Sequence, residues 1–200
     1  MQESRLFYTP LWQASLADEV REWPQLKQIM LDKIYALLAA EKGVEKTNFG
    51  GWQSADDLYR YPEFGWLVGR IMALANTIAP QFASNRRFDD GLLWANVNRH
   101  GNFNAVHTHP DSVLSGVAYL RFVQPEQGVI EFFDAREGCP TTHWRCYAQL
   151  EQGTELTRQV HTVVPSEGKI LFFPGWLKHW VTPNVSNEDR VSVSFNLRLN

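Results

Sequence analysis

Two kinds of hydrophobic pattern divide the chain. Between residues 15 and 40, apolar side chains recur at the three- and four-residue spacing of an amphipathic helix. They are Leu26, Ile29, Met30, Ile34, Leu37 and Leu38. Pro24 stands near the start of this helix, where its missing N–H costs little. A second stripe, formed by Phe64, Leu67, Val68, Ile71 and Leu74, predicts another helix from about residue 62 to residue 79.

From residue 91 onward the pattern changes to short β-type runs separated by Gly, Pro, Asn and Asp. The runs are LLWANV, SVLSGVAYLRFV, GVIEFF, RQVHTVV, KILFFP, HWVTP and RVSVSFNLRL. Many short strands in succession are typical of a sandwich or barrel. We therefore predict an α+β, mainly β fold: a double-stranded β-helix (a cupin-like jelly-roll) with N-terminal helices packed on one face. We expect a single domain over residues 1–200, with a helical flank at 1–90 and the β-helix core at 91–200.

Composition narrows the choice of partners and compartment. The net charge is −3 and no basic run is present, which disfavours nucleic acid as a partner. No apolar stretch is long enough to span a membrane, and the first residues lack the pattern of a secretory signal. The two cysteines, Cys139 and Cys146, belong to no CxxC pattern. We interpret them as reduced thiols of a cytoplasmic protein.

Three histidines are candidates for a metal site. His107 and His109 lie in NAVHTHPDS at the edge of a predicted strand. In an extended chain, residues two apart point to the same face, so both imidazoles can reach one ion. His179, in FPGWLKHWVTPN, stands where a later strand begins. The His-x-His pair alone is weak evidence, because surface or hydrogen-bonded histidines are more common than ligands.

The last predicted strand, DRVSVSFN, places a row of polar groups on one face. Alternation assigns Arg190, Ser192, Ser194 and Asn196 to that face, and Val191, Val193 and Phe195 to the other. Arginine can grip a carboxylate through two parallel hydrogen bonds, so this face suits an anion-binding lining. The alternative is the solvent face of an edge strand. The segment PNVSNED, residues 183–189, reads as a turn that joins the strand of His179 to that of Arg190 as an antiparallel pair.

In this order the motifs resemble the 2-oxoglutarate/Fe(II)-dependent oxygenases, and in particular a bacterial and phage group of 2OG-Fe(II) oxygenases. The pattern H-x-H-P-x-S-x-x-S-G matches residues 107–116. The patterns P-x-x-G-x-(I/L)-x-x-F-P-x-W-L-x-H and R-(I/V)-S-(I/V)-S-F-N match residues 165–179 and 190–196. The resemblance implies a dioxygenase that uses Fe(II), 2-oxoglutarate and O2. It would oxidise, and in most cases hydroxylate, a small-molecule or peptide substrate with release of succinate and CO2.

Two sets of iron ligands fit this resemblance. In one, His109-Pro110-Asp111 supplies a His-x-Asp motif that joins His179. In the other, His107 is the first ligand and His109 takes the place of the carboxylate. The segment NVNRHGNFNAVHTH also resembles the aspartyl/asparaginyl β-hydroxylases, and that alignment selects His107. Pro110 would interrupt the strand and turn Asp111 elsewhere, so we favour His107, His109 and His179.

The cosubstrate residues follow from the same resemblance. It implies that Arg190 and Ser192 bind the distal carboxylate of 2-oxoglutarate. Asn96 aligns with a cosubstrate-binding position of the β-hydroxylases, and Tyr119 with one of the prolyl hydroxylases. We expect no catalytic group beyond the metal ligands. The irregular stretch at 134–158 is predicted to be a loop that covers the substrate.

Two other classes of function are compatible with this fold. A cupin-like metalloenzyme, such as an isomerase or a direct dioxygenase, would use three histidines without 2-oxoglutarate. Arg190 and Ser192 argue against it, because such an enzyme needs no clamp for a diacid. A non-catalytic binding module would retain the fold alone. The jelly-roll also allows a homodimer through a sheet edge.

Overall fold

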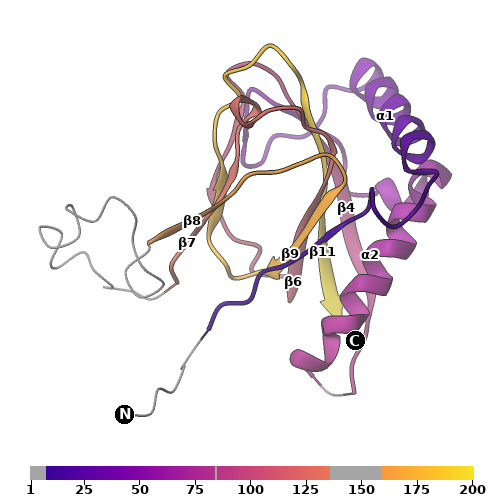
Figure 1. The fold of residues 1–200 in the computed structure, drawn as a ribbon, viewed down its shortest axis with the longest axis vertical. Helices are drawn as coiled ribbons and strands as arrows, with labels where there is room; N and C mark the ends of the chain where they lie inside the picture. Colours follow the sequence, from indigo (N-terminus) through magenta and orange to yellow (C-terminus); the bar gives the residue numbers. More distant parts are fainter. Residues whose placement is uncertain (1–7, 84, 136–158) are drawn as a thin grey trace, which may run out of the picture.

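The computed structural model describes residues 8–83, 85–135 and 159–200. Within them, two antiparallel sheets face each other, and both helices lie on one side of the larger sheet (Figure 1). The strand order is β1-β9-β6-β11-β4-β3 in the larger sheet and β2-β5-β10-β7-β8 in the smaller sheet. This arrangement confirms the predicted double-stranded β-helix with N-terminal helices on one face.

The elements have the following bounds. The larger sheet comprises β1 (Trp12–Ser15), β9 (Lys169–Pro174), β6 (Leu114–Arg121), β11 (Arg190–Leu199), β4 (Phe88–Asn98) and β3 (Trp52–Gln53). The smaller sheet comprises β2 (Asn48–Phe49), β5 (Phe103–His107), β10 (His179–Val181), β7 (Ile130–Phe133) and β8 (Val160–Val163). The helices are α1 (Trp23–Ala40) and α2 (Gly65–Ile78), and short 3-10 turns occupy Leu58–Arg60, Pro62–Phe64, Ala79–Gln81 and Pro125–Gln127.

Both helices form where the apolar periodicity predicted them. Pro24 lies in the first turn of α1. The helix α2 buries side chains four residues apart, Leu67, Ile71 and Ala75, against the larger sheet. The expected stripe on α1 is only partly buried. Met30, Ile34 and Leu37 are buried, whereas Ile29 is 48% exposed. Ile29 is therefore wrongly placed in the predicted stripe, because α1 turns the next residue toward the core.

Strand β11 divides the protein into a core and a pocket. Its Val191, Val193 and Phe195 pack in the cluster that includes both helices. Its polar residues face the opposite way, into the space between the sheets. Because β11 lies between β4 and β6 in the larger sheet, the interpretation as an exposed edge strand is wrong. The alternation predicted from DRVSVSFN is confirmed.

Two expectations about the connections are corrected. Residues 183–189 do not close a hairpin, since β10 belongs to the smaller sheet and β11 to the larger one. The segment instead carries the chain from one sheet to the other. The N-terminal flank is also more than helical, because β1, β2 and β3 pair with β9, β5 and β4. Strands as short as β2 and β3 are too short to show a periodic signal.

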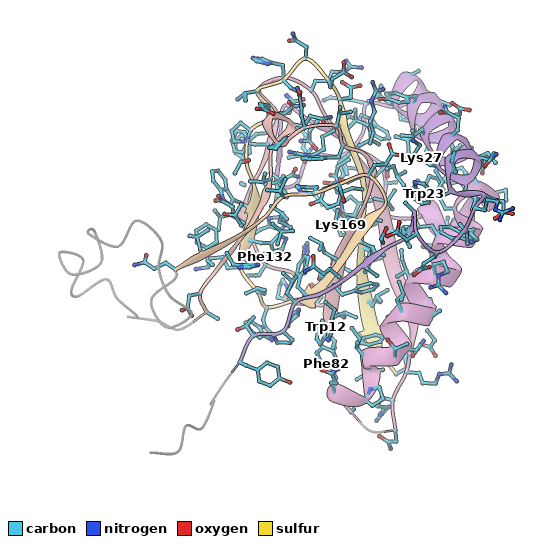
Figure 2. The ribbon with its side chains drawn as sticks, in the orientation of Figure 1. Trp12, Trp23, Lys27, Phe82, Phe132 and Lys169 are labelled. Carbon is cyan, nitrogen blue, oxygen red and sulfur yellow. The ribbon has the colours of Figure 1, made fainter. Side chains whose placement is uncertain are left out.

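Aromatic side chains fill both layers around the larger sheet. Trp12 of β1 lies beside Phe82, with ring centroids 5.8 Å apart, and Phe132 of β7 lies on the far side from the helices (Figure 2). In the part of the chain that the structure describes, no helix is both long and apolar enough to cross a bilayer. The predicted loop at 134–158 lies outside the described residues from 136 onward, and so do Cys139 and Cys146.

Candidate metal and cosubstrate site

Strand pairing brings the three candidate histidines together. In the smaller sheet His107, at the end of β5, stands directly opposite His179, at the start of β10. His109 follows two residues after His107 and turns toward the same point. One ring nitrogen from each of the three residues lies within 4.8 Å of the others. Among the described residues, this is the one group of His, Cys, Asp and Glu that has the spacing of a metal site.

Backbone carbonyls fix the tautomer of two of these rings. His107 Nδ1 lies 2.6 Å from the carbonyl oxygen of Ala105, and His179 Nδ1 lies 2.8 Å from that of Leu177. A carbonyl oxygen only accepts, so Nδ1 carries the hydrogen in both rings. Each Nε2 then presents its lone pair to the pocket, which is the form in which histidine binds a metal.

His109 is held from the other sheet. Its Nδ1 lies 3.2 Å from Nδ2 of Asn196 on β11. Oδ1 of the same amide accepts a hydrogen bond of 2.7 Å from the Ser115 hydroxyl on β6. The histidine cluster therefore lies between the two sheets: the smaller sheet supplies His107 and His179, and the larger sheet supports His109, which follows β5.

Burial keeps the imidazoles neutral. Desolvation, followed by the charge of His107, lowers the pKa of His179 to about 3. Desolvation lowers the pKa of His109 to about 4, with smaller contributions from His107 and Lys46. It also lowers the pKa of His107. Neutral rings are available to an ion without first losing a proton, so at neutral pH the cluster is ready to bind metal.

Asp111 does not join this cluster. It lies in an exposed turn after Pro110, and the spatial group of possible ligands contains His107 in its place. The alternative His109–Asp111–His179 set is therefore not assembled in the structure. Strand β5 ends at His107, and Pro110 and Asp111 lie in the turn that follows, so the carboxylate does not follow the direction of the two histidines.

The other end of the pocket carries a buried cation that has no acidic partner among the described residues. The Arg190 side chain is 1% exposed. Its Nη1 donates to the carbonyl oxygens of Gln127, at 2.6 Å, and Thr182, at 3.3 Å. Its Nη2 is buried and has no hydrogen-bond partner. Burial lowers the pKa of Arg190 to about 10, so the guanidinium stays charged at neutral pH and lacks an anion.

Three further predicted residues lie around Arg190. Ser192 follows it on the same face of β11, and Tyr119 is paired with Ser192 on β6. Burial raises the pKa of Tyr119, partly offset by the Arg190 charge, so its hydroxyl keeps its proton. Asn96 on β4 also pairs with Ser192. Its Nδ2 donates to the Ser194 hydroxyl at 3.1 Å, and its buried Oδ1 has no partner.

One pocket of about 240 Å³ connects the two ends. Its lining includes every predicted site residue except Asp111, namely His107, His109, His179, Asn96, Tyr119, Arg190 and Ser192. None of the described residues that line it is acidic, and Lys46 adds a second cation. Lys46 lies 3.5 Å from Asp56, and both side chains are about half-exposed. A positive pocket with a metal-binding cluster at one end suits a small anion that also binds a metal.

Sequence reasoning did not assign roles to several residues of this site. Asn196 was placed on the polar face, but nothing in the sequence showed that it contacts His109. Gln127 and Gly128 lie next to the Arg190 guanidinium, but Gln127 had no predicted role and Gly128 was only the first residue of the predicted strand run GVIEFF. Lys46 comes from the N-terminal flank. Each of these contacts joins segments far apart in the chain, so no local pattern could reveal it.

The fold and the pocket define the class of a metal-dependent jelly-roll enzyme that binds an anion. Residues 92–196 match the family model described as "Putative 2OG-Fe(II) oxygenase". The match covers more than half of the 200 residues, and the chain belongs to this family. It is therefore an Fe(II)- and 2-oxoglutarate-dependent oxygenase, as the motifs predicted. No curated protein shows significant sequence similarity to it.

Solved structures of low identity share the fold. A prolyl-4-hydroxylase from Pseudomonas putida has a TM-score of 0.67 at 18% identity, over 95% of this chain and 92% of that chain. The non-heme alpha-ketoglutarate-dependent epimerase SnoN from nogalamycin biosynthesis has a TM-score of 0.66 at 18% identity, over 95% and 78%. HygX from Streptomyces hygroscopicus, solved with nickel and 2-oxoglutarate bound, has a TM-score of 0.61 at 12% identity, over 94% and 82%. The finer resemblance to aspartyl/asparaginyl β-hydroxylases is not shown by these matches.

Proposed function

We propose that His107, His109 and His179 hold the Fe(II) through their Nε2 atoms, and that Arg190 binds the distal carboxylate of 2-oxoglutarate. Held by these residues, Fe(II) and 2-oxoglutarate would supply the O2-dependent oxidation of a substrate C–H bond, with release of succinate and CO2. The protein's own residues hold the metal, orient the diacid and shield both from water. The β-hydroxylase alignment, which selected His107, agrees with this set of ligands.

The unpartnered Nη2 of Arg190 carries this proposal. A buried cation without an acidic neighbour is costly unless an anion joins it. The guanidinium has one edge held by two carbonyl oxygens and the other edge free. That free edge is suited to a carboxylate oxygen. A cupin-like enzyme without 2-oxoglutarate would have no use for such a group.

The charge of the metal end also favours the diacid. Three neutral imidazoles leave the full positive charge of Fe(II) in the pocket, whereas a carboxylate ligand would cancel part of it. A metal with no anionic ligand attracts the 1-carboxylate of 2-oxoglutarate more strongly. We assign Ser192 and Tyr119 to the distal carboxylate, beside Arg190. Asn96 lies within the same pocket, and turning its amide would let Nδ2 donate to the diacid while Oδ1 accepts from Ser194.

The substrate that we propose is a small molecule or a peptide, and the reaction is hydroxylation. Turnover without that substrate offers a direct test, since such enzymes consume 2-oxoglutarate slowly on their own. We expect succinate to form from 2-oxoglutarate only when both Fe(II) and O2 are supplied, and to disappear in His179→Ala. Protein that binds Fe(II) but forms no succinate under these conditions would contradict the proposal.

Asn196 is expected to support the metal through His109. For His109 to bind through Nε2, its Nδ1 must carry hydrogen, so the Asn196 amide must turn over from the orientation described above. It then presents Oδ1 to His109 and its N–H to the Ser115 hydroxyl oxygen. Replacing Asn196 with leucine removes this acceptor, and we expect Fe(II) affinity to fall roughly 10- to 100-fold. Asn196→Asp keeps an acceptor for His109. Its Fe(II) affinity should be higher than that of Asn196→Leu and closer to that of the wild type.

Calorimetric titration of the metal-free variants with Fe(II) under anaerobic conditions measures this difference. Ser115→Ala is the control, because it changes the same hydrogen-bond network but keeps the Asn196 acceptor for His109. We expect it to lower Fe(II) affinity less than Asn196→Leu does. If Asn196→Leu binds Fe(II) as tightly as wild type, the amide does not support His109.

A further inference from the structure

The position of the Arg190 guanidinium depends on backbone carbonyls. Its two hydrogen-bond acceptors are the carbonyl oxygens of Gln127 and Thr182, and both bind Nη1. No acidic residue lines the described part of the pocket, so no carboxylate of these lining residues competes for the guanidinium. Whatever fixes these two carbonyl groups therefore also fixes the direction of the free Nη2 edge.

Gln127 is fully buried, and its side chain forms hydrogen bonds with the segments on both sides of Arg190. Its Oε1 accepts hydrogen bonds from the backbone N–H groups of Val123 and Gln124. The bond from Gln124 belongs to a capping box at the start of the 3-10 turn Pro125–Gln127. Its Nε2 donates to the carbonyl oxygen of Asp189 at 2.8 Å. Asp189 directly precedes Arg190, so one amide holds both the carbonyl that receives the guanidinium and the backbone from which the arginine extends.

The neighbouring residue leaves room for this contact. Gly128 has a φ of +92°, in the region that favours glycine. A Cβ atom built on Gly128 would overlap Arg190 Nη1 and the Thr182 carbonyl oxygen. The second acceptor is tied to the same segment, because Thr182 N donates to the Val129 carbonyl at 2.9 Å and Val129 N donates to the Thr182 hydroxyl at 2.8 Å. Both acceptors of the guanidinium are thus connected to one short turn.

We infer that Gln127 is a positioning residue for cosubstrate binding: its side chain sets the direction of the Arg190 guanidinium and thereby the affinity for 2-oxoglutarate. Gln127 does not touch the diacid itself. Both acceptor positions of its Oε1 and one N–H of its Nε2 form hydrogen bonds within the protein, and it does not line the pocket. The inference rests on the proposed role of Arg190, and it adds a residue that neither the motifs nor the fold assigns.

The test compares 2-oxoglutarate affinity in variants of the full chain. Gln127→Met preserves the size of the side chain and removes all three hydrogen bonds. We expect it to raise the 2-oxoglutarate dissociation constant at least about tenfold, a loss of the size of one or two hydrogen bonds, with unchanged Fe(II) affinity. Gln127→Glu keeps the acceptors for Val123 and Gln124 and loses the donor to Asp189. It should weaken 2-oxoglutarate binding too, and it provides a second variant if Gln127→Met does not fold.

Asn76 offers a matched control. Its amide also makes three hydrogen bonds, to the Met72 carbonyl and to both backbone groups of Phe88, on the helix side of the larger sheet. Asn76→Leu should lower the melting temperature about as much as Gln127→Met does and leave 2-oxoglutarate affinity unchanged. Equal losses of 2-oxoglutarate affinity in both variants would mean that general destabilisation is responsible, and would overturn the inference.

A double-mutant cycle with Arg190→Ala separates this inference from the proposed function. If Gln127 acts through Arg190, then Gln127→Met changes the dissociation constant by less than about twofold once Arg190 is absent. Additive effects would overturn the role of Gln127 and leave that of Arg190 intact. If Arg190→Ala itself binds 2-oxoglutarate like wild type, the assignment of Arg190 fails, and the inference about Gln127 fails with it.

Discussion

Replacing His107 with alanine is expected to abolish Fe(II) binding, whereas replacing Asp111 with alanine leaves it intact. The reason is geometric: His107 faces His179 across two paired strands, and Asp111 lies in an exposed turn outside the cluster. Loss of a direct ligand should exceed the roughly 10- to 100-fold loss typical of removing a supporting partner. Calorimetric titration with Fe(II) under anaerobic conditions measures both variants.

His100→Ala is the matched control for the loss of a histidine. His100 comes from the same part of the chain, and its Nδ1 lies 3.1 Å from the carbonyl oxygen of Ser186, away from the cluster. We expect it to bind Fe(II) like wild type. If Asp111→Ala abolishes binding and His107→Ala retains it, the carboxylate set of ligands is correct and the three-histidine set is wrong.

Arg190→Ala is expected to weaken 2-oxoglutarate binding by on the order of 100-fold or more, since losing one partner of a buried charge pair costs about 2–5 kcal/mol. Fe(II) affinity should not change, because Arg190 lies outside the metal cluster. Arg190→Lys keeps the charge but loses the planar fork, so its effect should be intermediate. The measurement is the 2-oxoglutarate concentration that gives half-maximal binding to the Fe(II)-loaded protein.

Arg198→Ala provides the comparison on the same strand. Arg198 is about half-exposed and pairs with Asp90 at 3.4 Å, beyond the pocket. The Arg198→Ala variant should bind 2-oxoglutarate with the affinity of the wild type. If Arg190→Ala and Arg198→Ala bind the diacid equally well, the buried guanidinium has another role.

The parts of the fold that follow from local periodicity could be predicted from the sequence. The alternation in β11 gave both faces of that strand, and the stripe on α2 gave the face that packs on the sheet. The histidine cluster was within reach for the same reason: an i, i+2 pair on a strand has a fixed direction. The third histidine, His179, was a candidate from its place at the start of a later predicted strand, but only the family resemblance joined it to the pair.

The parts that depend on how distant segments meet could not be predicted. The sequence PNVSNED has the composition of a turn, and such a composition is the same for a hairpin and for a crossing between sheets. The jelly-roll uses it as a crossing. The contact of Asn196 with His109 and that of Gln127 with Asp189 each join residues more than sixty positions apart. No periodic pattern encodes them.

The central claim is that one pocket binds Fe(II) through three histidines and 2-oxoglutarate through both the metal and Arg190. Anaerobic addition of 2-oxoglutarate to the Fe(II)-loaded wild-type protein, followed by visible absorbance, tests it most directly. The account predicts a charge-transfer band that saturates as the diacid binds the metal and that requires a higher 2-oxoglutarate concentration in Arg190→Ala. An Fe(II)-loaded protein that develops no band at any 2-oxoglutarate concentration would contradict it.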